Sequence, residues 1–340
     1  MKKGLIFFTI LAVLLSSLAF SAGPFIDWAN LKNPVYQYKN WSIKDSCVAY
    51  HNETFYIFFS AFYFDDGRDR CHISAVKTKD FKNYSEPLFI WRGESGAWDG
   101  MCSPNIIKID DTFYLTYNSW GDDKNQPNQL FYAKSKNLER WENDKPLAAN
   151  VTKGKRSIDA AIAKANGKYY LVWKEDQTPM MGVGDTLGPE GWKRLGTVPG
   201  GWFENGEFIQ IDEKWYLLAT DKAHLPVLRA IRNDGRTDED WLNLCRGAAS
   251  CAQNQAGQSR VFRGTLQKSG QFQRLNIPLE KFNTVERANC AFLIDWRDYD
   301  GFFYLLYSGR NQGFFHEGDN YFKLGIARSQ DLLSSQVPPK

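Results

Sequence analysis

Several features that would define other protein classes are missing from this 340-residue chain. Lys and Arg number 42 against 39 Asp and Glu, and a net charge of +3 is too balanced for a concentrated phosphate-binding face. Nucleic acid is therefore not an expected partner. The four histidines are scattered and no CxxC motif occurs, which argues against a zinc site. No pattern predicts a helix longer than two turns.

Long apolar runs are also missing, except near the N-terminus. Lys2 and Lys3 precede an apolar stretch at residues 5–15, and small residues follow up to Ala22. This pattern is typical of a secretory signal peptide, so we expect residues 1–21 to be removed and the remaining chain to be secreted. The apolar stretch is short for a membrane span, and no later segment is long enough to be one. We expect no membrane partner after removal of the signal.

The cysteines are few, and all six follow the N-terminal segment. An even number in an oxidising compartment favours disulfides. Cys245 and Cys251 lie close together in a loop-like stretch, so we expect these two to pair. The other four allow three pairings, among which the sequence does not choose: Cys47, Cys71, Cys102 and Cys290.

Aromatic residues are abundant, at 15% of the chain, which suits both a strand-rich fold and a sugar-binding cleft. Five segments share one pattern: a short strand, a turn rich in Asn, Asp or Gly, and a second strand of aromatic and aliphatic residues. In most of them a third strand and a similar closing phrase follow. The second strands are predicted at residues 55–59, 113–117, 169–173, 215–218 and 302–307, and the closing phrases at residues 78–84, 135–141 and 329–332.

Self-similar β units of this size predict an all-β fold, a five-bladed β-propeller. We expect residues 22–340 to form one domain, because β architectures of this length are often single domains. Residues 233–258 are predicted to be an insert that contains the Cys245–Cys251 pair. Residues 261–266 and 272–275 would then supply outer strands of the fourth unit. A β-sandwich is the alternative fold, but it does not explain the recurring closing phrase.

Three acidic residues stand at nearly the same place in three units. Asp45 and Asp159 precede the second aromatic residue of the following strand by eleven residues, and Glu204 precedes it by twelve. The first strand of each propeller blade lines the central channel, so these side chains are expected to meet there. The corresponding positions in the other units are Ser103 and, after a longer hairpin, Arg287 or Asn289.

Carboxylates that share one channel cannot all ionise at low cost, because repulsion and reduced solvation raise at least one pKa. Glycoside hydrolysis needs such a set, since one acid protonates the leaving oxygen while another activates water. Glu204 has apolar neighbours that favour a proton donor, and Asp45 is the expected base. Glu207 is a rival for the acid. Candidates for contact with the sugar are Trp98 and Trp202 by stacking, and Arg287 by binding a hydroxyl or carboxylate.

On these residues the chain resembles the five-bladed propeller glycosidases of glycoside hydrolase family 43. The resemblance runs from Asp45-Ser46-Cys47 through Ser157-Ile158-Asp159-Ala160 to Glu204 and the strand after it. It implies that Asp45 is the general base, that Asp159 tunes and orients the acid, and that Glu204 is that acid, with inversion at the anomeric carbon. The family usually has Pro after both aspartates and Gly-Pro after the glutamate, and this chain departs at all three places, which suggests a divergent branch.

The expected function is hydrolysis of a pentose-containing polysaccharide, as by an α-L-arabinofuranosidase, arabinanase or β-xylosidase. A retaining fructosidase is one alternative, although the chain lacks Asn-Asp-Pro-Asn near Asp45 and Glu-Cys in the fourth unit. A non-catalytic sugar-binding propeller is another. No cofactor is expected. A calcium or sodium ion in the channel is implied by analogy alone, since no ligand cluster supports it. Carbohydrate is the expected partner, and the sequence does not indicate an oligomeric state.

Overall fold

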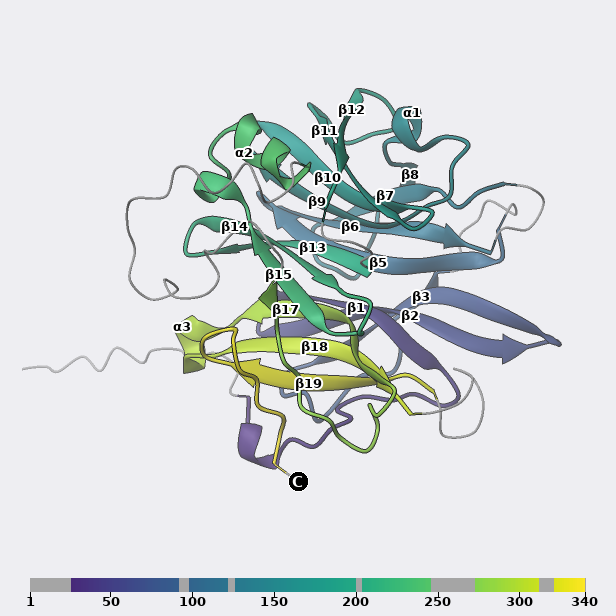
Figure 1. The fold of residues 1–340 in the computed structure, drawn as a ribbon. Helices are drawn as coiled ribbons and strands as arrows, with labels where there is room; N and C mark the ends of the chain where they lie inside the picture. Colours follow the sequence, from purple (N-terminus) through teal and green to yellow (C-terminus); the bar gives the residue numbers. More distant parts are fainter. Residues whose placement is uncertain are drawn as a thin grey trace, which may run out of the picture.

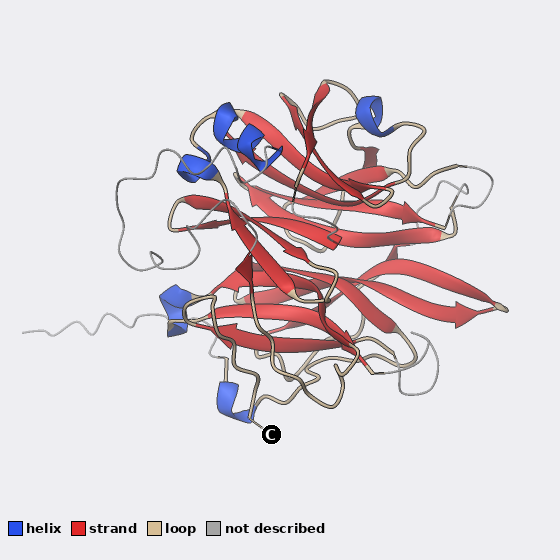
Figure 2. Ribbon diagram, viewed as in Figure 1, coloured by secondary structure: helices blue, strands red, loops and turns tan. Residues whose placement is uncertain are grey.

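The structure, a computed structural model, describes residues 26–91, 98–121, 126–199, 204–245, 273–311 and 321–339. Strands dominate this part of the chain, and the helices are short and peripheral (Figure 2). None of the described helices is long and apolar enough to span a membrane. The predicted signal peptide, Trp202, Cys251 and the strand predicted at residues 261–266 lie outside the described residues.

The first two groups of antiparallel strands share one sheet. A single parallel pairing, between Cys71 and Gly100, joins them. Glycine is required at this contact, because a Cβ atom on Gly100 would lie 1.9 Å from the carbonyl oxygen of Cys71. The strands of the first group are β1 (Ser42–His51), β2 (Thr54–Asp65), β3 (Arg68–Thr78) and β4 (Ile90–Trp91), and those of the second are β5 (Gly100–Ile109), β6 (Thr112–Trp120), β7 (Leu130–Ser135) and β8 (Lys145–Pro146).

The other described strands form three separate antiparallel sheets. The third group is β9 (Ser157–Ala165), β10 (Lys168–Glu175), β11 (Thr178–Gly184) and β12 (Trp192–Thr197), the fourth is β13 (Glu204–Ile211), β14 (Lys214–Thr220), β15 (Pro226–Ala230) and β16 (Gln273–Arg274), and the last is β17 (Glu286–Asp295), β18 (Phe303–Arg310) and β19 (Lys323–Ser329). The short helices are η1 (Trp28–Asn30), α1 (Ala149–Thr152), η3 (Arg232–Gly235), α2 (Asp238–Leu242), η4 (Asn243–Cys245) and α3 (Arg297–Asp300).

The first strands of the groups lie around a common axis (Figure 1). They contact one another in cyclic order, β1 with β5, β5 with β9, β9 with β13, β13 with β17, and β17 again with β1. Backbone hydrogen bonds also join the first group to the last, since Ile43 N–H in β1 donates to the carbonyl oxygen of Phe322, just before β19, over 2.9 Å. The expected all-β propeller is confirmed, and the described strands fall into five groups.

The second strands form the core between neighbouring sheets. They are buried on both faces, because each sheet packs against the next, so their sequences are almost continuously apolar. Aromatic side chains fill the space between the sheets, which explains the aromatic-rich second strands of the sequence pattern. Fully buried examples are Phe55, Phe58, Phe59, Tyr117, Tyr170, Trp173 and Tyr304.

The closing phrases form one recurring turn between the third and fourth strands. In the second group, the hydroxyl of Ser135 accepts a hydrogen bond from Leu138 N–H over 2.8 Å, and Asn137 Oδ1 accepts one from Arg140 N–H over 2.9 Å. Leu138 has a φ of 66°, and its side chain is buried. The same bonds recur around Thr78, Asp80 and Phe81 in the first group, and around Ser329, Asp331 and Leu332 in the last.

The predicted insert begins as short helices. Trp241 in α2 is fully buried and stacks on Tyr170 with ring centroids 4.0 Å apart, which attaches the insert to the third group. The predicted outer strand at residues 272–275 is present as β16, which pairs with β15.

The structure corrects the expectation of disulfides among the four other cysteines. Cys47, Cys71, Cys102 and Cys290 are free, buried thiols in the structure, so no disulfide joins any two of them. They occupy packed positions within the strands, where free cysteine behaves as a small apolar side chain. The pairing of Cys245 with Cys251 is untested, because Cys251 lies outside the described residues.

Candidate active site

Each first strand carries an irregularity at the same level of the channel. In β1 the pairing with β2 shifts between Lys44 and Cys47, and Asp45 between them has a φ of 55°. A left-handed backbone costs a non-glycine residue roughly 1–2 kcal/mol, and such strain clusters at functional sites. The equivalent residues, which we call the rim residues, are Asp45, Ser103 (φ 55°), Asp159 (φ 59°), Asn205 (φ 46°) and Cys290 (φ 51°).

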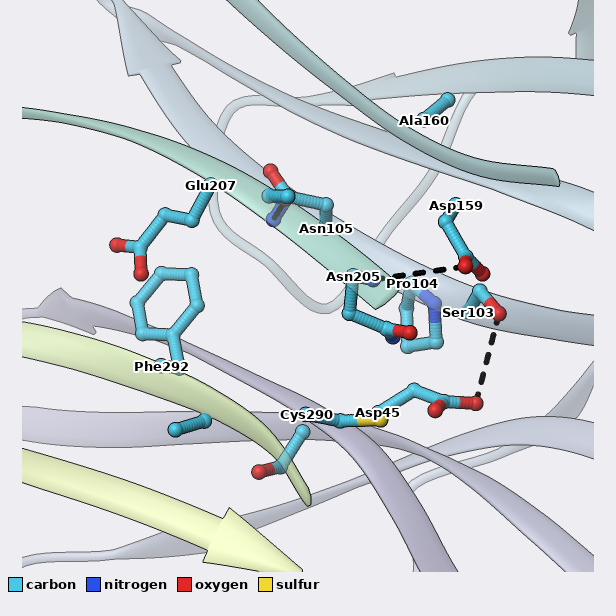
Figure 3. Close-up of a pocket in the computed structure, with 13 residues that line it drawn as sticks. Asp45, Ser103, Pro104, Asn105, Asp159, Ala160, Asn205, Glu207, Cys290 and Phe292 are labelled. Atoms are coloured by element: carbon cyan, nitrogen blue, oxygen red, sulfur yellow. Dashed lines mark hydrogen bonds between the residues drawn. The ribbon is translucent and has the colours of Figure 1, made fainter. Parts of the chain in front are cut away.

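All five rim residues line one pocket (Figure 3). The space between the lining residues is about 270 Å³ when the open solvent at its mouth is included. The structure thus brings together Asp45, Ser103 and Asp159, as the matched offsets predict, whereas Glu204, predicted to join them, is not among the lining residues. The other lining residues are Ser46, Pro104, Asn105, Ala160, Gly206, Glu207, Ala291 and Phe292.

Asp45 is held in place by hydroxyl groups from two strand groups. Its Oδ2 atom accepts a hydrogen bond from the hydroxyl of Ser60 over 2.6 Å and a longer one from Ser103 over 3.5 Å. Ser60 in turn accepts the backbone N–H of Ser103 over 2.8 Å. The carboxyl group of Asp45 is buried yet faces the pocket, which is the placement that a base acting on a bound molecule requires.

Asp159 belongs to a cluster of charged side chains with Lys174 and Glu204. Its backbone N–H donates to Asn118 Oδ1 over 3.0 Å, and its Oδ2 atom lies 3.3 Å from Lys174 Nζ. The same ammonium group lies 3.1 Å from Glu204 Oε1. Burial by itself lowers the pKa of Lys174, but the negative charges of Asp159 and Glu204 outweigh it, so the pKa is raised. Lys174 is therefore positively charged at neutral pH.

The two glutamates considered for the acid lie in different surroundings. Glu204 precedes the rim residue Asn205 by one position and contacts Lys174, with 23% of its side chain exposed. Glu207 lines the pocket, and its Oε2 atom accepts the backbone N–H of Leu293 over 2.9 Å. Burial raises the pKa of Glu207 well above its usual range. Figure 3 shows it beside Phe292, apart from Asp45 and Asp159.

The remaining predicted site residues do not line the pocket. The indole N–H of Trp98 donates to the carbonyl oxygen of Gln126 over 3.2 Å, and its ring packs on Phe131. Asn289 is buried and its side chain donates to Glu286 over 2.7 Å. Arg287 also lies outside the lining set, and Trp202 is outside the described residues.

Three residues of the site were not singled out from the sequence: Asn205, Cys290 and Lys174. Asn205 could have been found, because it precedes Tyr216 by eleven residues, the same offset as Asp45 and Asp159 in their units. Cys290 was obscured by the longer hairpin of the last group. Burial raises the pKa of its thiol well above the usual range, so the group is neutral in the pocket. Lys174 stands four residues beyond Tyr170 in its strand, but nothing in the sequence marks its contact with Asp159 and Glu204.

No metal site stands out in the part of the chain that the structure describes. Within those ranges, no group of three or more His, Cys, Asp or Glu side chains is arranged to hold a metal ion. The described residues therefore give no support to a metal-bound channel, and the calcium or sodium ion stays an analogy.

The fold and the pocket together define an all-β propeller with a carboxylate site at its axis. Residues 31–224 match the family described as glycosyl hydrolases family 43. The chain belongs to this family, and it is a glycoside hydrolase. No curated protein sequence matches it.

Solved structures show the same fold at low sequence identity. A glycosyl hydrolase from Bacteroides ovatus is 15% identical, with 88% of this chain and 87% of that one covered and a TM-score of 0.57. An exo-1,5-α-L-arabinanase from a bovine ruminal metagenomic library is 14% identical, with coverage of 86% and 95% and a TM-score of 0.53. An arabinanase from Bacillus subtilis is 13% identical, with coverage of 84% and 94% and a TM-score of 0.54. These identities indicate a divergent member.

Proposed function

We propose that the protein is an exported, inverting glycoside hydrolase that acts on a pentose-containing polysaccharide or oligosaccharide such as arabinan, arabinoxylan or xylan. The observation that carries this proposal is the meeting of Asp45 and Asp159 in one channel pocket, with Glu204 tied to Asp159 through Lys174. The pentose class is supported by the similar structures, two of which are arabinanases. Export is supported by the signal-like segment at residues 1–21.

In the proposed reaction, Asp45 accepts a proton from a water molecule as that water attacks the anomeric carbon. Glu204 gives a proton to the oxygen of the leaving sugar, and Asp159 orients this acid. Attack from the face opposite to the leaving group inverts the configuration, which requires a base and an acid roughly 6.5–9.5 Å apart. The bonds from Ser60 and Ser103 keep the Asp45 carboxyl facing the pocket. Each proton transfer is worth about 10²–10⁴ in rate.

The test is hydrolysis of aryl α-L-arabinofuranosides and β-D-xylosides, with the first-formed anomer of the product followed by proton NMR. We expect inversion, and Glu204→Gln should lower kcat about 10²–10⁴-fold. Retention would favour the fructosidase-type mechanism. Sugar binding without turnover would favour a non-catalytic propeller. If Glu207→Gln abolishes turnover and Glu204→Gln does not, Glu207 is the acid.

Export is tested on its own by expression of the full chain. We expect the protein to be recovered outside the cytoplasm with a new N-terminus at residue 22. A secreted chain that keeps residues 1–21 would contradict the proposed cleavage.

A further inference from the structure

A polar side chain recurs at one place in every second strand, four residues beyond the second aromatic residue. In three groups this side chain accepts the backbone N–H of the rim residue in the next group. The bonds are Ser103 N–H to Ser60 Oγ (2.8 Å), Asp159 N–H to Asn118 Oδ1 (3.0 Å) and Cys290 N–H to Thr220 Oγ1 (2.9 Å). The five equivalent residues, all buried, are Ser60, Asn118, Lys174, Thr220 and Ser308.

Lys174 departs from this pattern, because an ammonium group is only a donor and cannot accept a backbone N–H. The N–H of the next rim residue, Asn205, is directed at Asp159 Oδ2 instead, over 3.4 Å. The lysine side chain reaches two carboxylates that come from different groups, Asp159 from β9 and Glu204 from β13. Four of the five equivalent positions carry a neutral side chain, and the charged one lies where these two acids meet.

We propose that Lys174 is a positioning residue, which holds Asp159 and Glu204 as one unit across the boundary between the third and fourth groups. The inference rests on the proposed function for the roles of the two acids. Its physical basis is independent of those roles, since a buried carboxylate is stable only when it is paired. Glu204 stands one residue before the rim, so a long cationic side chain is needed to hold it beside Asp159.

The kinetic test is a double-mutant cycle of Lys174→Met with Glu204→Gln, measured as kcat and KM on the aryl glycoside. If Lys174 acts through Glu204, the double variant loses no more kcat than the worse single variant, to within about twofold. Losses that multiply would overturn the proposal. Lys174→Arg, which keeps the charge, should recover most of the kcat that Lys174→Met loses. Ser308→Ala, the matched control at the equivalent position of the last group, should leave kcat within about twofold.

A second measurement does not depend on activity, and it separates failure of this inference from failure of the proposed function. At pH 7, Lys174→Met should lower the melting temperature by about 5 °C or more, because it leaves a buried carboxylate without its partner. A melting temperature that is unchanged at pH 7 would overturn the inference even if the enzyme is active. If Lys174→Met does not fold, Lys174→Arg and Lys174→Gln are compared in the same way.

Discussion

The inner and outer edges of the strand groups follow opposite rules. At the outer edge, the closing turns repeat both the residue types and the hydrogen bonds, as around Ser135 and Ser329. At the inner edge the backbone irregularity repeats, but the rim residues differ in chemistry: Asp45, Ser103, Asp159, Asn205 and Cys290. Where the residue types repeat, the fold requires them. Where the backbone repeats but the residue types differ, the side chains serve the chemistry of the pocket.

The physical reason lies in the reach of the interactions. A closing turn satisfies its backbone groups within a few residues of chain, so the same short phrase works in any group. A rim residue is held by a side chain of a neighbouring group, as Ser60 of the first group holds Ser103 of the second. Its side chain is therefore free to vary with its role in the pocket.

The largest expected effect is at the rim. Asp45→Asn should lower kcat about 10²–10⁴-fold, because the amide cannot accept a proton from water. Its side-chain oxygen can still accept the hydroxyl of Ser60, so we expect a melting temperature close to that of the wild type. Turnover of an aryl glycoside and a thermal melt of the same sample check both statements. Unchanged kcat would mean that the rim does not carry the chemistry.

The next effect is at the outer edge. Ser135→Ala should lower the free energy of unfolding by about 1–2 kcal/mol, since the backbone N–H of Leu138 loses its acceptor. Urea denaturation measures this loss, and kcat of the folded variant should stay within about twofold of the wild type. Ser329→Ala in the last group is the matched variant and should lose a similar amount. A fall in kcat without loss of stability would break the contrast between the two edges.

The smallest effect concerns Glu207, which lines the pocket but is placed like a structural residue. Burial raises its pKa well above the usual range, so the folded protein binds this proton more tightly than the unfolded chain does. The wild type is therefore most stable below the usual carboxyl pKa, and it loses stability as the pH rises above that value. Glu207→Gln cannot ionise, and its amide oxygen can still accept the N–H of Leu293.

We expect Glu207→Gln to melt a few degrees above the wild type at pH 8 and at the same temperature near pH 4. Thermal melts across this range decide the point. Parallel curves for the two proteins would show that folding does not raise the pKa of Glu207.

Much of the fold was accessible from the sequence alone. The second strands, the closing phrases and the all-β propeller were predicted correctly, because a recurring pattern of aromatic strands and tight turns is a local property of the chain. The same holds for the convergence of Asp45, Ser103 and Asp159, since equal offsets in equal repeats lead to equal positions around the axis. The disulfides expected among Cys47, Cys71, Cys102 and Cys290 are absent from the structure, because a cysteine count does not report which thiols are joined in the fold. The Cys245–Cys251 pair stays a prediction.

By itself the sequence determined that two aspartates face one channel, because the alternation of side chains along a strand and the length of each repeat are local properties of the sequence. The eleven-residue offset marks Asn205 in the sequence, but only the tertiary structure decided that this residue, and not Glu204, occupies the fourth rim position. It also decided that Lys174 joins Asp159 to Glu204. A bulge changes the direction of a side chain within one residue, and a contact between groups joins residues far apart in the chain. The repeat pattern offers candidates for both, but it does not choose among them.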